Sequence, residues 1–223
     1  MRLAALLAAI GLTACGPSSL EPQVEINPAD FVLLPCGLAG DAPPCTLVVI
    51  GGKRLLFGAP SGISSGLMDE DLEQLDGVFL FSLRSADIEG LDEVRNASWH
   101  AGRDAPLPVT GPQGTGDLIA GVNFAFETAD ALRIVDAGIP KGGFDAAILV
   151  EMKTRDQMHD VVFDTGDVVI QAERRSDQAV RYIITYQNRP PLLIEPCRSE
   201  ECSFADRAEW PLVRPHFIVK TEP

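Results

Sequence analysis

Short apolar runs separated by polar turns recur along most of the chain, a pattern typical of a domain rich in β-strands. Residues 46–50 and 54–57 are apolar runs on either side of Gly51-Gly52, and such a pair of runs predicts a β-hairpin. Residues 78–83 form a longer apolar run of the kind that is buried inside a sheet. Further strands are predicted at 146–150, 161–163, 168–170, 180–186 and 192–194.

Two stretches carry the spacing of amphipathic helices instead. Met68, Leu72 and Leu75 fall on one side of an acidic segment, which predicts a short helix over 69–75. A second helix is predicted after Thr115, whose side chain can cap it. The apolar side of this helix comprises Leu118, Ile119, Val122 and Phe126. Strands with interspersed helices indicate one mixed α and β domain.

The amino-terminal segment differs from the rest of the chain. Arg2 precedes an apolar stretch over 3–12, which is too short to span a bilayer but has the length of a secretory signal. The stretch ends in Leu-Thr-Ala before Cys15, which resembles the lipobox of bacterial lipoproteins, where the signal is cut before an acylated cysteine. We therefore expect a signal peptide at 1–14, a lipidated Cys15 with a tether over 15–30, and a single domain over 31–223.

That resemblance also implies a cellular location. Residue 16 is Gly rather than Asp, which in Gram-negative lipoproteins implies sorting to the outer membrane. The expected location is therefore the cell envelope, with the protein lipid-anchored to the outer membrane and facing the periplasm. The expected partners are the bilayer, through acylated Cys15, and an unidentified protein or small molecule.

The overall composition excludes several classes of protein. Hydrophobic residues make up 46% of the chain, so it is neither a disordered chain nor a multi-pass membrane protein. The formal net charge is −14, and a surface this acidic repels phosphate backbones, so nucleic acid is not expected as a ligand.

Four cysteines remain beyond Cys15: Cys36, Cys45, Cys197 and Cys202. An even number in an oxidising compartment predicts disulfides. We favour the pairs Cys36–Cys45 and Cys197–Cys202, because each closes a short loop. The alternative is a zinc site made of all four thiolates, but the paired C-x2-C spacing of such sites is absent.

Residues 78–91 (VFLFSLRSADIEGL) resemble the metallo-β-lactamase superfamily around its T-H-x-H-x-D-H-x-x-G-L motif. The preceding hairpin over 46–58 and the acidic helix match the approach to that motif in order and spacing. Residues 99–115 and 168–197 look like the corresponding stretches of the ribonuclease Z and arylsulfatase-like branch. The resemblance implies an αββα sandwich, which we expect to be truncated at the C-terminus, before the usual final strand, helix and histidine.

Members of that superfamily hold zinc ions with imidazoles and carboxylates, and the zinc activates a water molecule. On this motif, Ser82 and Arg84 stand at the first two histidines, Ala86 at the aspartate and Asp87 at the last histidine. Pro196 stands at the aspartate of a later motif. The fixed positive charge of Arg84 disfavours a bound dication. We therefore predict that zinc binding is lost and that the chain has no metal cofactor.

The remaining ligand positions agree with this prediction. The third-motif histidine falls near Glu173, and the aspartate of an earlier loop is replaced by Gly58. The chain has only three histidines, His100, His159 and His216, and none stands in an H-x-H or H-x-x-x-H pair. These isolated imidazoles are interpreted as non-catalytic.

Three functions follow from these patterns. The favoured one is a membrane-anchored, metal-free pseudo-hydrolase that acts as an envelope binding or scaffold protein. The first alternative is a hydrolase with a rebuilt esterase-like or phosphodiesterase-like site, which would use Ser82, Arg84 and Asp87, or Ser64 of a G-x-S-x-G match. Pro60 and other loop residues separate Ser64 from the preceding strand, which speaks against that match. The second alternative is a structural subunit of an envelope complex.

Overall fold

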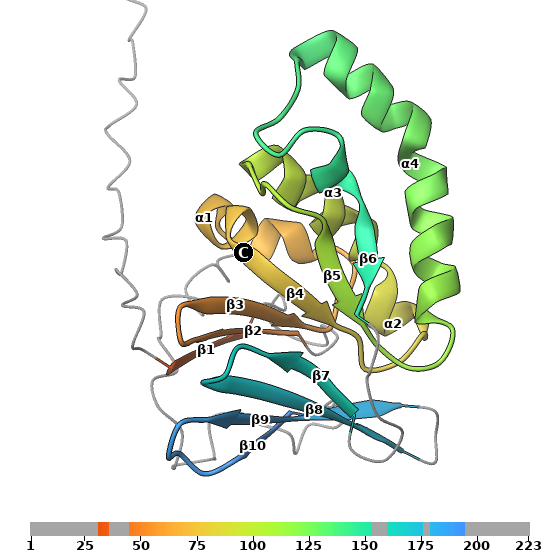
Figure 1. Ribbon diagram of the computed structural model, residues 1–223. Coiled ribbons are helices and arrows are strands. Elements are labelled where there is room, and N and C mark those ends of the chain that lie inside the picture. Colours follow the sequence, from red (N-terminus) through yellow and green to blue (C-terminus); the bar gives the residue numbers. More distant parts are fainter. Residues whose placement is uncertain (1–30, 36–44, 153–159, 176–178, 195–223) are drawn as a thin grey trace, which may run out of the picture.

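The computed structural model of the 223-residue chain describes residues 31–35, 45–152, 160–175 and 179–194. Two β-sheets face each other, and helices cover the outer face of one of them (Figure 1). The predicted signal peptide, Cys15 and the tether lie outside the described residues and stay predictions. No helix within the described ranges is long and apolar enough to cross a membrane.

The first sheet, sheet A, has six strands that follow one another in chain order. The strands β1 to β3 pair antiparallel and β3 to β6 pair parallel. Gly51 and Gly52 form the tight turn between β2 and β3 with φ angles of 56° and 73°, a conformation that glycine adopts without a steric penalty. The strands are β1 (Phe31–Pro35), β2 (Thr46–Ile50), β3 (Lys53–Phe57), β4 (Leu75–Phe79), β5 (Leu107–Thr110) and β6 (Leu149–Glu151).

The second sheet, sheet B, is antiparallel and has the strand order β10-β9-β8-β7. Its buried face packs against sheet A through aromatic residues. The rings of Phe57 and Phe79 stack at 4.6 Å, and Tyr182 meets each of them edge-on at 5.5 Å. The strands are β7 (Asp160–Asp164), β8 (Val168–Arg174), β9 (Val180–Tyr186) and β10 (Leu192–Ile194).

The other face of sheet A is covered by helices. Strand β2 shows the division, because Leu47 and Val49 belong to the helix-facing core and Val48 and Ile50 to the core between the sheets. The α-helices are α1 (Asp69–Glu73), α2 (Ser85–Ile88), α3 (Leu91–Ala101) and α4 (Thr115–Ala137), and the 3-10 helices are η1 (Ile63–Gly66) and η2 (Asp145–Ala147). A helical layer on the outer face of sheet B is not among the described residues.

Most predicted elements are present, although some of their limits differ. The strands at 46–50, 180–186 and 192–194 have the predicted bounds. The strand predicted at 78–83 lies earlier, at Leu75–Phe79, so the helix predicted to reach residue 75 ends at Glu73. Thr115 does not cap α4, because the N-cap is Gly114 and the Thr115 hydroxyl donates to the carbonyl of Pro112 at 2.7 Å.

Two buried arginines hold the helices to the rest of the domain. Arg54 of β3 donates from Nε to Asp71 Oδ1 of α1 at 2.9 Å. Arg95 of α3 forms a bidentate ion pair with Asp130 of α4. The side chains of this pair are buried, with exposed fractions of 1% for Arg95 and 3% for Asp130. Each of these guanidinium groups is thus neutralised by a carboxylate on a neighbouring element.

Candidate functional site

The candidate site is the loop that follows β4, which carries the motif positions 82–87. Three hydrogen bonds fix where this loop leaves the sheet. Leu80 N donates to Thr110 O at 2.8 Å, the Tyr182 hydroxyl donates to Leu80 O at 2.7 Å, and Val180 N donates to Phe81 O at 2.7 Å. The loop is therefore held by β5 of sheet A and β9 of sheet B at once. Burial raises the pKa of the Tyr182 phenol, so this hydroxyl remains a donor.

Ser82 of the loop and Asp87 of α2, which follows it, face each other. Both are buried, with exposures of 3% and 1%. The Ser82 hydroxyl donates to Asp87 Oδ2 and accepts a hydrogen bond from Arg84 N at 3.2 Å. These three motif positions thus form one small network, in which the serine oxygen is both donor and acceptor.

The end of the motif is fixed by a close backbone approach. Ala59 N donates to Asp87 O at 3.0 Å, and Gly90 N donates to Ala59 O at 2.8 Å. A Cβ atom on Gly90 would lie 2.0 Å from the carbonyl oxygen of Pro60, a distance that no side chain tolerates. Glycine at this position therefore lets α2 and the start of α3 pack against the loop after β3.

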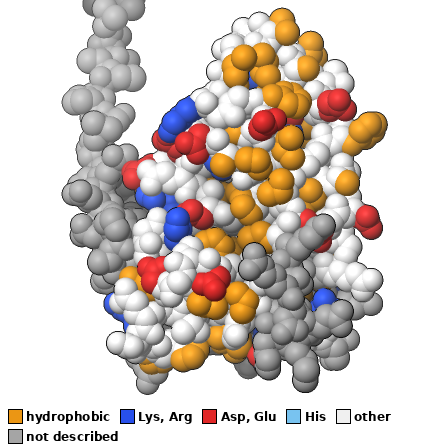
Figure 2. Space-filling view, in the orientation of Figure 1, with side chains coloured by type: hydrophobic (Ala, Val, Ile, Leu, Met, Phe, Trp, Pro, Cys, Tyr) orange, Lys and Arg blue, Asp and Glu red, His pale blue; other side chains and the backbone are white. Residues whose placement is uncertain are grey.

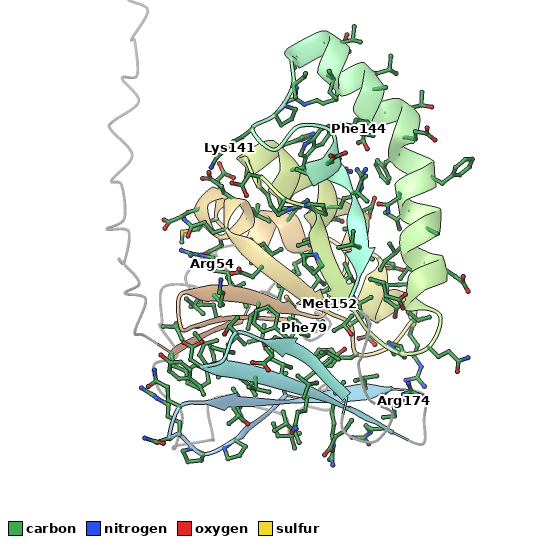
Figure 3. The ribbon with its side chains drawn as sticks, viewed as in Figure 1. Arg54, Phe79, Lys141, Phe144, Met152 and Arg174 are labelled. Atoms are coloured by element: carbon green, nitrogen blue, oxygen red, sulfur yellow. The ribbon has the colours of Figure 1, made fainter. Side chains whose placement is uncertain are left out.

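A cavity of about 530 Å³ opens beside this network. Its lining joins segments that are far apart in the sequence, because Arg84 comes from the motif loop and Arg174 and Arg175 come from the end of β8. Figure 3 shows Arg174 at the edge of the molecule where β8 ends, near the loop below α4. The lining also includes Ser82, Gln113 and Val180. Three arginines therefore contribute to the lining of one cavity of an acidic protein.

Zinc does not fit the residues that the structure describes at this site. Ser82 and Asp87 are hydrogen-bonded to each other, Arg84 brings a positive charge, and Ala86 has no donor atom. Within the described ranges, no three His, Cys, Asp or Glu side chains are grouped so that they could hold a metal ion. Glu173, at the third-motif position, accepts from Arg181 Nε at 2.6 Å. Pro196 lies outside the described residues, so the loss of zinc stays a prediction.

The other candidates from the sequence lie elsewhere. Ser64 is on η1, after a loop rather than directly after a strand, and its hydroxyl donates to Glu93 Oε2 at 3.3 Å. His100 lies near the end of α3, and burial lowers its pKa. His159 and His216 lie outside the described residues. The arrangement expected of a nucleophile elbow at Ser64 is therefore not observed.

The cysteine predictions are not tested. Cys45 is buried directly before β2 and is disulfide-bonded. Every other cysteine, including Cys36, Cys197 and Cys202, lies outside the described residues. Neither the pairing Cys36–Cys45 nor the pairing Cys197–Cys202 is therefore established.

Sequence reasoning did not find Arg174 and Arg175. They stand in the segment 168–197 that the resemblance covers, but no spacing connects them with Arg84, which lies 90 residues earlier than Arg174. Only the meeting of the two sheets brings these side chains to the same cavity.

Comparison with known proteins supports the fold. No family model and no curated protein matches the chain. Among solved structures, the short form of human tRNase Z is similar with a TM-score of 0.50 and 14% identity, over 74% of this chain and 67% of that chain. The metallo-β-lactamase fold protein YhfI from Bacillus subtilis is similar with a TM-score of 0.49 and 14% identity, over 74% of this chain and 61% of that chain. The likeness to tRNase Z confirms the predicted metallo-β-lactamase-type fold, and the expected truncation at the C-terminus stays a prediction.

Proposed function

We propose that this chain, which has the metallo-β-lactamase fold, is a metal-free binding protein that holds an anionic group of its ligand in the cavity beside Arg84. The ligand class is a carboxylate or a phosphate, because both present two or more oxygens to a guanidinium fork. The protein would act in the cell envelope, anchored by acylated Cys15. The anchor is supported by the lipobox-like sequence before Cys15.

One observation carries the proposal: Arg84, Arg174 and Arg175 line the same cavity of a chain whose net charge is −14. A cavity lined by one sign of charge concentrates ligands of the opposite sign. Arg174 and Arg175 make contacts of their own within the chain, so no direct contact with the ligand is assigned to them. Arg84 is exposed at the cavity and is the group that we assign to direct contact with the anion.

The network of Ser82 and Asp87 supports binding rather than hydrolysis. A serine hydroxyl becomes a nucleophile when a base removes its proton. The acceptor of the Ser82 proton is the carboxylate of Asp87, and no histidine is among the described residues that line the cavity. The pair is better suited to hold the loop that presents Arg84, since Arg84 N donates to the same serine oxygen.

The test is a calorimetric titration of the purified chain with inorganic phosphate in the presence of a zinc chelator. We expect saturable binding, and we expect Arg84→Gln to weaken it about 10- to 100-fold, because a hydrogen bond to a charged group contributes about 1.5–3 kcal/mol. The matched control is Arg189→Gln, which removes the same charge from a guanidinium that lies over the Phe31 and Tyr186 rings. This control should bind phosphate as the unmodified chain does.

Two results would contradict the proposal. One is the absence of measurable binding to the unmodified chain. The other is an equal loss of affinity in both variants, since this would show that overall charge, rather than the cavity, attracts the anion. Release of phosphate from phenyl phosphate by the unmodified chain, abolished by Ser82→Ala, would instead favour the hydrolase alternative.

A further inference from the structure

Helix α4 exposes apolar side chains to solvent along its outer face. Phe124 and Val135 are each 80% exposed, Leu132 is 56% exposed, and Ile139, directly after the helix, is 70% exposed. The helix has 23 residues, so it is about 35 Å long. Figure 2 shows hydrophobic side chains gathered on this part of the surface. The exposed apolar residues from Phe124 to Val135 extend over about 17 Å of the helix, and monomeric soluble proteins rarely expose large contiguous apolar patches.

The inner side of α4 carries polar residues beside the apolar Ile119, Val122 and Ile134, which pack against the core, so the helix has apolar residues on both sides. Asp130 is buried in its ion pair with Arg95. Asn123 donates from Nδ2 to Leu149 O at 2.9 Å and accepts from Leu149 N at 3.0 Å. These contacts fix how the helix is turned about its axis. With the inner side held in this way, Phe124, Leu132 and Val135 face outward.

An apolar groove continues this face toward the motif. It has a volume of about 330 Å³ and lies between α4 and the segment from α2 to α3. Its lining includes Ile88, Leu91, Gly121, Val122, Ala125 and Phe126. Gly121 and Ala125 are small and exposed, so an approaching side chain can reach the groove from the outer face of the helix. Face and groove together form a surface suited to an amphipathic helix.

The charges around this surface indicate what covers it. The exposed charged residues of α4 are Asp117, Glu127 and Asp136, and all are acidic. Asp92 adds another acid at the groove. A second copy of the chain would place acids against acids, and an anionic lipid surface would be repelled in the same way. Charge complementarity therefore favours a partner with cationic side chains beside its apolar stripe.

We propose that the outer face of α4 and the adjoining groove bind an amphipathic helix of another protein, one whose apolar stripe is flanked by lysine or arginine. This surface is separate from the cavity at Arg84, since the two share no lining residue. The interaction does not depend on what the cavity holds.

The experiment places the photo-crosslinking residue p-benzoylphenylalanine at position 124 of the full chain. The probes are a synthetic helical peptide of leucine and lysine with leucine along one side, and a control peptide in which every lysine is glutamate. We expect light-dependent attachment of the lysine peptide and at least ten-fold less of the glutamate peptide. The double substitution Leu132→Ser, Val135→Ser, which keeps every charge, should reduce labelling by about ten-fold.

Other results of the same crosslinking experiment would contradict the proposal. Attachment to a second copy would assign the surface to self-association. Attachment to residues 195–223 of the same chain would show that the chain covers its own helix. Equal labelling by the two peptides, labelling that the double substitution leaves unchanged, or no attachment at all would each contradict it.

Discussion

Arg95 and Arg84 lie 11 residues apart in the sequence, yet the domain uses them in opposite ways. Arg95 is 1% exposed, and the carboxylate of Asp130 on α4 binds its guanidinium through both oxygens. Arg84 is exposed at a cavity that two further arginines line. An arginine that meets a carboxylate of its own fold contributes to structure. We propose that one exposed at a cavity beside other arginines contacts an anionic ligand instead.

Removing Arg95 is expected to have the larger effect on stability. Arg95→Met leaves Asp130 as a buried carboxylate without its cation, and we expect the free energy of unfolding to fall by about 3–5 kcal/mol. The measurement is urea unfolding at neutral pH. The double substitution Arg95→Met, Asp130→Leu is the sharper control, because replacing both charges with apolar residues should restore most of the loss. A loss of less than about 1 kcal/mol in the single variant would show that the ion pair does not hold α4.

Arg84→Gln is expected to have little effect on stability. Its guanidinium is exposed, and the backbone N–H that donates to Ser82 remains in the variant. We expect a change within about 0.5 kcal/mol in the same unfolding measurement. If this variant were destabilised as much as Arg95→Met, Arg84 would be a structural residue, and the contrast between the two arginines would fail.

The strands could be predicted from the sequence where local chemistry and burial agree. The β2–β3 hairpin is such a case, since Gly51-Gly52 lies between two apolar runs. The limits of β4 were wrong because Asp76-Gly77 has the composition of a turn. In the structure, Asp76 Oδ2 accepts a hydrogen bond from Arg54 N at 2.9 Å, and Gly77 lies inside the strand. The Asp76 side chain thus takes the place of a backbone acceptor for the neighbouring strand. Such a residue does not show in the alternation of apolar and polar positions.

Helix α3 was not predicted for a related reason. Its buried side includes Arg95 and Ser98 as well as apolar residues, and Ser98 Oγ accepts from Arg103 Nε at 3.1 Å. A search for apolar spacing misses a helix that is buried through ion pairs and hydrogen bonds.

The site was predictable only in part. The resemblance directed attention to 82–87, where the structure has a hydrogen-bond network of Ser82, Arg84 and Asp87, but the role of these residues stays a prediction. The cavity depends on where β8 ends relative to the motif loop, which is a property of the packed sheets. The outward apolar face of α4 was missed because its inward side also carries apolar residues, so the spacing alone did not show which side is exposed.

The central claim is that this fold binds through guanidinium charge instead of zinc. Its most direct test is equilibrium dialysis of the purified chain against zinc, with disulfides intact, followed by elemental analysis of metal per chain. We expect no more zinc than in a dialysed buffer blank without protein. We also expect the dialysed chain to bind phosphate as tightly as it does with a zinc chelator present. Tightly held zinc at one or two ions per chain, the number expected for a catalytic site of this fold, would contradict the claim.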